Sequence, residues 1–189
     1  MRKRDIMRTG SKVTTLALTT GLALGSFVGV SGSAQAATSG STITTFTLTA
    51  GALAITVPAS TVALATGTVN TGAATAAGQL GPVTVADSRG LLVNSWTTTV
   101  SSTTFVTGTS TTNETVAVAN IAYASGASTA HTGLGVFVPT LVPTALGADA
   151  SYTGAAGNSS TTWDPTLTFT LLSSQVAGTY TGTVTHSVA

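Results

Sequence analysis

Few side chains of this sequence are of the types that carry out acid–base, nucleophilic or metal chemistry. His131 and His186 are the two histidines, and neither is spaced to share a metal with another histidine or with a run of acids. Serine is abundant, but the Gly-x-Ser-x-Gly turn that exposes a nucleophilic serine is absent. The sequence therefore predicts no catalytic residue, no metal site and no cofactor, and we expect a protein that is not an enzyme.

The acidic residues beyond position 36 are also poorly arranged for catalysis. Asp87, Glu114, Asp149 and Asp164 are scattered, whereas glycoside cleavage needs two carboxylates in one cleft. His186 alternates with apolar residues near the end of an expected strand, which predicts an inward or rim position rather than a reactive one. His131 lies in a segment of Ala, Ser, Thr and Gly, so we expect it in solvent.

One short motif has a clear structural interpretation. In Asp87-Ser88-Arg89-Gly90, an aspartate at the first position of a turn can accept a hydrogen bond from the backbone two residues on, and glycine suits the fourth position. We therefore expect Asp87 and Gly90 to be structural residues of a turn. Arg89 is expected either to point into solvent or to pair with Asp87.

The two tryptophans, Trp96 and Trp163, are the candidate ligand contacts of the chain. An exposed indole could stack on the face of a sugar ring, whereas a buried indole fills a core. Both alternatives stay open here, although burial is favoured because the chain has so few other large side chains.

The first part of the chain has the composition of an export signal. Residues 1–36 combine a basic leader, a mostly apolar stretch and the small-x-small sequence Ala34-Gln35-Ala36, which together predict a secretory signal peptide. Residues 37–41 are a short flexible lead-in, and residues 42–189 are expected to form one domain. We expect an extracellular protein, secreted or wall-associated, with no membrane span after cleavage.

Removal of the leader changes the charge of the chain. Arg89 is then the one cation against four carboxylates, which gives a formal net charge of −3. A chain with a single cation cannot neutralise a phosphate backbone, so nucleic acid is excluded as a partner. The sequence holds no cysteine, so the domain must be held together by its core rather than by disulfides.

Short runs of alternating apolar and polar residues predict the fold. The chain is rich in Thr and Val, and Gly, Pro and Ser separate the runs, as is typical of antiparallel strands and turns. The predicted strands cover residues 43–48, 53–57, 62–69, 83–85, 96–100, 116–123 and 134–138, with a loop at 70–78. The fold class is therefore all-β, an antiparallel immunoglobulin-like β-sandwich. Aromatic residues are expected to supply most of its core: Phe46, Trp96, Phe105, Tyr123, Trp163, Phe169 and Tyr180.

The clearest alternation lies near the carboxyl terminus. Residues 166–171 place Leu167 and Phe169 on one face, and residues 179–188 place Tyr180, Val184 and Val188 on one face, with a break at 173–178 between the two runs. We expect an antiparallel hairpin that opens at Trp163 and closes a sheet.

The same two regions carry a resemblance to a known family. The Asp87–Gly90 turn before the strand from Trp96, and the late Trp163 before Gly178-Thr179-Tyr180-Thr181-Gly182-Thr183-Val184, resemble the WxL-type domains of Gram-positive bacteria and their actinobacterial relatives. The chain departs from the signature itself, with Thr98 after Trp96-Thr97 where the motif has Leu. The resemblance implies an exported domain that attaches non-covalently to the cell wall, with peptidoglycan as the proposed ligand. Phe169, Tyr180, Gly182 and Val184 are expected to be structural residues of the closing hairpin.

Two functional hypotheses follow from the sequence. The first is a secreted, non-catalytic surface protein that binds the cell wall through this β-sandwich. The second is a self-assembling structural subunit of a surface layer, fibre or coat, for which strands rich in Thr, Val, Ala and Gly with little charge are suited.

The expected processing can be tested directly. Signal peptidase should cut after Ala36, because Ala34 and Ala36 place small residues at the two positions that the enzyme reads. N-terminal sequencing of protein from culture medium or wall extract should therefore read Ala37-Thr38-Ser39. Recovery of an extracellular form that begins at Met1 would contradict this prediction.

Overall fold

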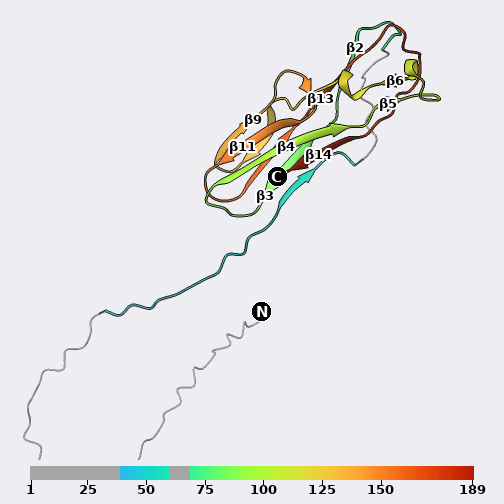
Figure 1. The fold of residues 1–189 in the computed structure, drawn as a ribbon. Coiled ribbons are helices and arrows are strands. Elements are labelled where there is room, and N and C mark those ends of the chain that lie inside the picture. The colour runs from blue at the N-terminus through green and yellow to red at the C-terminus, as the bar shows by residue number, and fades with distance from the viewer. Residues whose placement is uncertain (1–38, 60–68) are drawn as a thin grey trace, which may run out of the picture. The chain divides into compact units, whose positions relative to one another are not determined.

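The structure is a computed structural model that describes residues 39–59 and 69–189. Residues Phe46–Ala189 form a compact unit, which is described here by itself (Figure 1). The expected signal peptide, residues 1–36, lies outside the described residues, so its cleavage stays a prediction. The described residues are all-β, with several open antiparallel sheets and two 3₁₀ turns, and no helix among them is long and apolar enough to cross a membrane.

Two four-stranded sheets make up the larger part of this unit. The first has the order β1-β3-β12-β8, and the second has the order β14-β4-β11-β9, whose four strands are labelled in Figure 1. The strands of the first sheet are β1 (Leu53–Thr56), β3 (Val83–Asp87), β12 (Ser159–Trp163) and β8 (Ser128–Thr132). The strands of the second are β14 (Val184–Val188), β4 (Asn94–Ser102), β11 (Ala148–Gly154) and β9 (Gly135–Val138).

The remaining strands form a third sheet and a short pair. The third sheet has the order β10-β7-β13-β2, and β5 pairs with β6. Their bounds are β2 (Thr75–Gln79), β5 (Phe105–Val106), β6 (Thr115–Val116), β7 (Ile121–Ala124), β10 (Thr144–Ala145) and β13 (Thr166–Thr170). The 3₁₀ turns η1 (Thr112–Glu114) and η2 (Val118–Asn120) flank β6.

Alternation in the sequence decides which face of each strand is buried. In β4, the side chains of Trp96, Thr98 and Val100 are buried while the residues between them are exposed. The strands β3 and β12 show the same period of two, as half-buried strands with one core face do.

The first cluster of the core joins the two large sheets. We call it the aromatic cluster, and its buried members are Val83, Val85, Trp96, Tyr152 and Trp163. Val83, Val85 and Trp163 belong to the first sheet, whereas Trp96 and Tyr152 belong to the second. The two sheets therefore share one layer of side chains.

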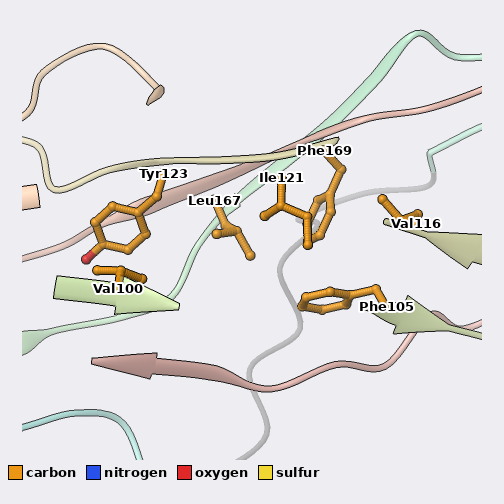
Figure 2. Close-up of a cluster of buried hydrophobic side chains, with 7 residues drawn as sticks. All are labelled: Val100, Phe105, Val116, Ile121, Tyr123, Leu167 and Phe169. Atoms are coloured by element: carbon orange, nitrogen blue, oxygen red, sulfur yellow. The ribbon is translucent and has the colours of Figure 1, made fainter. Parts of the chain in front are cut away.

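The second cluster lies where the third sheet and the β5–β6 pair meet the end of the second sheet. Its seven buried side chains are those drawn in Figure 2: Val100, Phe105, Val116, Ile121, Tyr123, Leu167 and Phe169. The rings of Phe105 and Phe169 meet edge to face, with centroids 4.8 Å apart and an interplanar angle of 72°. Gly182 passes so close to Phe105 that an added Cβ would lie 2.6 Å from the ring, so this position requires glycine.

The expected closing hairpin is wrong. The run that contains Phe169 forms β13, which pairs with β2 and β7, whereas the run that contains Val184 forms β14, which pairs with β4 in another sheet. Trp163 ends β12 instead of opening a hairpin. The faces were predicted correctly, because Leu167, Phe169 and Val184 all pack in the second cluster. Alternation identifies the buried face of a strand but not its partner.

Other strand predictions are confirmed in part. Strands are present at β1, β3, β4, β7 and β9 within or close to the predicted ranges, but residues 43–48 form no strand and Phe46 is 85% exposed instead of buried in the core. The predicted loop 70–78 includes most of β2, and β8, β10, β11 and β12 lie where no strand was predicted. The predicted strand 62–69 lies outside the described residues except for Val69.

The two phenylalanines Phe169 and Phe46 give a matched test of the core. Phe169→Ala should lower the free energy of unfolding by about 3–5 kcal/mol, because it removes a buried ring and leaves a cavity beside Phe105. Phe46→Ala should change it by no more than about 0.5 kcal/mol, because that ring is exposed. Urea unfolding of dilute protein measures both, and equal losses for the two variants would contradict this assignment of the core.

Candidate functional site

The Asp87 turn has the geometry that the sequence predicts. The carboxylate of Asp87 is buried, and its Oδ1 accepts hydrogen bonds from the backbone N–H of Arg89 and from Nε of the same residue, both at 3.0 Å. The guanidinium also donates from Nη2 to Asp87 Oδ2 at 2.6 Å and to the carbonyl of Ser95 at 2.9 Å. Gly90 has a φ of 63°, which glycine adopts without strain. The expected cap and the expected pairing of Arg89 with Asp87 are both confirmed.

This pair ties a turn to a strand rather than forming a binding site. The side-chain hydrogen bonds from Arg89 hold the pKa of Asp87 below its ordinary value, so the carboxylate stays ionised and keeps its acceptor role at neutral pH. Arg89 reaches from the turn after β3 to the backbone of β4 at Ser95. The single cation beyond residue 36 is therefore already engaged within the protein.

Neither tryptophan is placed for contact with a ligand. Trp96 and Trp163 are 3% and 0% exposed, and their rings stack on each other at 6.1 Å with an angle of 18°. Tyr152 stacks on Trp96 at 5.5 Å, and Phe137 stacks on Trp163 at 5.3 Å. The burial of both tryptophans, which the composition favoured, is confirmed. The alternative, in which an exposed indole stacks on a sugar ring, is wrong because both rings are buried.

The two histidines each lie within hydrogen-bond distance of one hydroxyl side chain. His186 Nε2 lies 2.9 Å from the hydroxyl of Tyr123, and Trp163 Nε1 donates to the same hydroxyl at 3.5 Å. Burial lowers the pKa of His186 to about 4, so its imidazole is neutral at pH 7 and can accept a hydrogen bond from the hydroxyl of Tyr123. The inward position predicted for His186 is confirmed. His131 is exposed as predicted, although it lies in β8 and its Nδ1 is 3.0 Å from Thr161 Oγ1.

The described residues contain no cluster of side chains suited to a metal ion. Among them, no group of three or more His, Asp or Glu side chains is close enough to hold a metal ion. A shallow depression of about 340 Å³ beside η1 and η2 contains no titratable side chain. Its lining residues are Ser110, Thr112, Thr115, Ala117, Asn120 and Leu172.

The carboxyl group of Asp149 is buried without a hydrogen-bond partner among the described residues. The side-chain oxygens of Asp149, in β11, accept no hydrogen bond from the described residues, and burial raises the pKa of this carboxyl to about 6. The nearby polar groups of Thr140 and Ser125 offset only part of the effect of burial. Asp149 also raises the pKa of Tyr123, although burial of that phenol is the larger cause. This carboxyl affects stability rather than forming a reactive site.

A different surface has the composition of a binding site, which we call the hydroxyl face. It is the outward side of the second sheet, where hydroxyl side chains of three adjacent strands lie in register. Its members are Ser95, Thr97, Thr99 and Ser101 of β4, Ser151 and Thr153 of β11, and Thr185 and Ser187 of β14. Cross-strand neighbours meet, as in Thr99 Oγ1 and Ser187 Oγ, which are 2.6 Å apart. The set is uncharged and largely exposed.

The hydroxyl face was missed in the sequence, although part of its signal is visible there. The positions that alternate with Trp96, Thr98 and Val100 are all Ser or Thr: Ser95, Thr97, Thr99 and Ser101. Only the strand order brings Thr99 beside Ser187 and Thr97 beside Ser151, because these residues are far apart in the chain.

Comparison with protein families, with curated proteins and with solved structures finds no match for this chain. The resemblance to WxL-type domains therefore rests on the motifs around Asp87, Trp96, Trp163 and Tyr180 alone.

The pH dependence of stability should report the burial of Asp149. Its pKa is about 6 in the folded protein and near 3.9 in an unfolded chain, so the folded state binds more protons between these values and its stability falls as the pH rises through about 6. Asp149→Asn removes this loss. The free energy of unfolding of the variant minus that of the parent should therefore increase from pH 4 to pH 7.

Urea unfolding at several pH values between these limits measures the difference. His186, whose lowered pKa has the opposite effect in this window, is present in both proteins, so its contribution cancels. A difference that does not change with pH would show that Asp149 titrates normally.

Proposed function

We propose that this chain is an exported, non-catalytic surface protein whose immunoglobulin-like β-sandwich associates non-covalently with cell-wall peptidoglycan. The observation that carries the proposal is the hydroxyl face, an uncharged and exposed array of hydroxyl groups on one sheet. Export is supported by the composition of residues 1–36, and wall attachment by the motif resemblance around Trp96 and Tyr180. The protein would be extracellular, either released or retained at the wall.

The sandwich architecture is supported by the shared aromatic cluster. Two four-stranded antiparallel sheets contribute to one layer of buried side chains, as the inner faces of a sandwich do. Each sheet pairs strands that are distant in sequence, such as β3 with β12 and β4 with β14, which is typical of Greek-key connections.

Hydrogen bonding must supply the affinity, because charge cannot. Wall polymers are largely anionic, and the chain beyond residue 36 carries a formal net charge of −3 with Arg89 already paired to Asp87. A polymer of sugar and peptide units presents many hydroxyl, amide and carbonyl groups that can bond to Ser and Thr. Each such bond contributes only about 1 kcal/mol, so binding requires several in parallel. An array in register along the β4 strand offers them at regular spacing.

The threonines of this face also lose little freedom on binding. A β-branched side chain on a strand has a restricted χ1 angle, so Thr97 and Thr99 are already ordered before a ligand arrives. A surface that is already ordered loses less conformational entropy for each contact that forms on binding.

Co-sedimentation with purified peptidoglycan tests this function. The chain from Ala37 onward should sediment with the polymer, and raising the salt concentration should leave binding unchanged or improve it, because the net charge term is repulsive. The double variant Thr97→Val, Thr99→Val keeps the shape of the strand but removes two hydroxyl groups, and it should weaken binding at least about fivefold.

The matched control is the double variant Thr144→Val, Thr170→Val, which removes two exposed strand hydroxyls from the third sheet and should bind like the parent. Elution by moderate salt, or equal losses in both double variants, would refute binding through the hydroxyl face.

The alternative function is that of a self-assembling subunit of a surface layer, fibre or coat. An exposed apolar segment that precedes β1 favours it, and the inference below depends on that segment rather than on wall binding.

A further inference from the structure

A segment that precedes the first strand is apolar, extended and exposed. We call residues Ile43–Leu48 the arm. Ile43, Phe46 and Leu48 are 95%, 85% and 86% exposed, although no residue of the arm is charged. Large apolar side chains at this level of exposure are unusual when they are grouped, and such groups mark interaction sites.

The arm has the sequence of a strand without a partner. In Thr44-Thr45-Phe46-Thr47-Leu48, threonine alternates with apolar residues from position 45 onward, and all of these residue types favour strands. Yet the described chain makes its first backbone hydrogen bond to another described residue only at Gly51, whose N–H donates to the carbonyl of Ser88. The arm therefore has the sequence of a β-strand, but it pairs with no strand of the described residues.

The second sheet ends in an open edge with a matching surface. Strand β9 pairs with β11 on one side and with no other strand of the described residues on the other (Figure 1). Phe137 of β9 faces the aromatic cluster, while Val136 and Val138 point outward and are 64% and 54% exposed. Leu134, 73% exposed, extends this aliphatic row at the start of the strand.

Two other open edges, β14 and β8, lack this aliphatic row. Strand β14, at the opposite edge of the same sheet, presents Thr185 and Ser187 outward, and β8 of the first sheet consists of Ser, Thr, Ala and His. Natural proteins protect exposed edges with charged side chains, but residues 115–148, which include β9, contain no Lys, Arg, Asp or Glu. The β9 edge is therefore both apolar and unprotected.

We propose that the arm of one copy of this protein adds as a strand to the β9 edge of a second copy. Backbone hydrogen bonds of the added strand would supply affinity, and contacts of Phe46 and Leu48 with the row formed by Leu134, Val136 and Val138 would fix the register. Six extended residues span about 20 Å, which is more than the four residues of β9 need.

The symmetry of this contact determines the assembly. Arm and edge are different surfaces of the chain, so the contact is heterologous. Reciprocal exchange of arms between two copies would close a dimer, whereas addition in one direction would give rings or linear assemblies. This inference goes beyond wall binding and does not depend on it, because the hydroxyl face contains no residue of the arm or of β9.

Disulfide trapping tests the contact, since the natural sequence has no cysteine to interfere. One protein carries Leu48→Cys and the other carries Val136→Cys or Val138→Cys, each in the chain from Ala37 onward. A disulfide requires Cβ atoms about 4 Å apart, so at least one of these mixtures should cross-link at least about tenfold faster than the control mixture. The control pairs Leu48→Cys with Leu92→Cys, an exposed position that lies on no strand.

Assembly in solution gives the second measurement. The parent chain should associate as its concentration increases, and the double variant Phe46→Asp, Leu48→Asp should remain monomeric in sedimentation velocity runs. Leu92→Asp should assemble like the parent. An unchanged urea midpoint for the double variant would show that its domain stays folded, as expected for exposed positions.

Two results would overturn the proposal: a parent chain that is monomeric at every concentration, or cross-linking no faster than in the control mixture. The two proposals fail separately. The Phe46→Asp, Leu48→Asp variant should still sediment with peptidoglycan, and the Thr97→Val, Thr99→Val variant should still assemble.

Discussion

The stack of aromatic rings between the two large sheets is the interaction on which the rest of the structure depends. Trp96 and Tyr152 come from one sheet and Trp163 from the other, and Phe137 packs against both tryptophans. The sequence has no cysteine, so no disulfide supports this packing. Each aromatic side chain buries about 150–250 Å², a large contribution in a chain built mainly from Ala, Gly, Ser and Thr. Because Trp96, Tyr152 and Trp163 are buried in this stack, none of these three rings is exposed for contact with a ligand.

This use of the aromatic residues leaves the surface to small polar side chains. On β4, each inward residue such as Trp96 or Val100 is followed by an outward Ser or Thr, and its neighbours β11 and β14 continue the pattern. The resulting hydroxyl face is uncharged because the charged residues are few and some have structural roles. Arg89 and Asp87 hold a turn against β4, and Asp149 is buried. A surface of this kind is suited to many weak hydrogen bonds and not to electrostatic attraction.

The arm and the β9 edge both expose apolar side chains. Many large apolar side chains of the described residues are exposed, and two groups of them suit strand pairing: Phe46 and Leu48 before the first strand, and Val136 and Val138 at an open edge. Grouped apolar side chains of this kind indicate a contact that a single copy does not complete. The two proposed contacts use different residues of one sheet, because Val136 and Val138 lie beside Thr153 and Ser151 of the hydroxyl face.

The sequence by itself determined the fold class, the local turn chemistry and the buried faces. Alternation identified β1, β3 and β4, the Asp87–Gly90 motif identified its turn, and composition favoured the burial of Trp96 and Trp163. These features depend on neighbours within a few residues, which a sequence displays directly. Only the tertiary structure decided that β13 and β14 belong to different sheets, that Thr99 lies beside Ser187, and that the strand-like arm stays outside. Strand pairing depends on contacts between residues that are distant along the chain, and a period of two is the same whichever partner a strand finds.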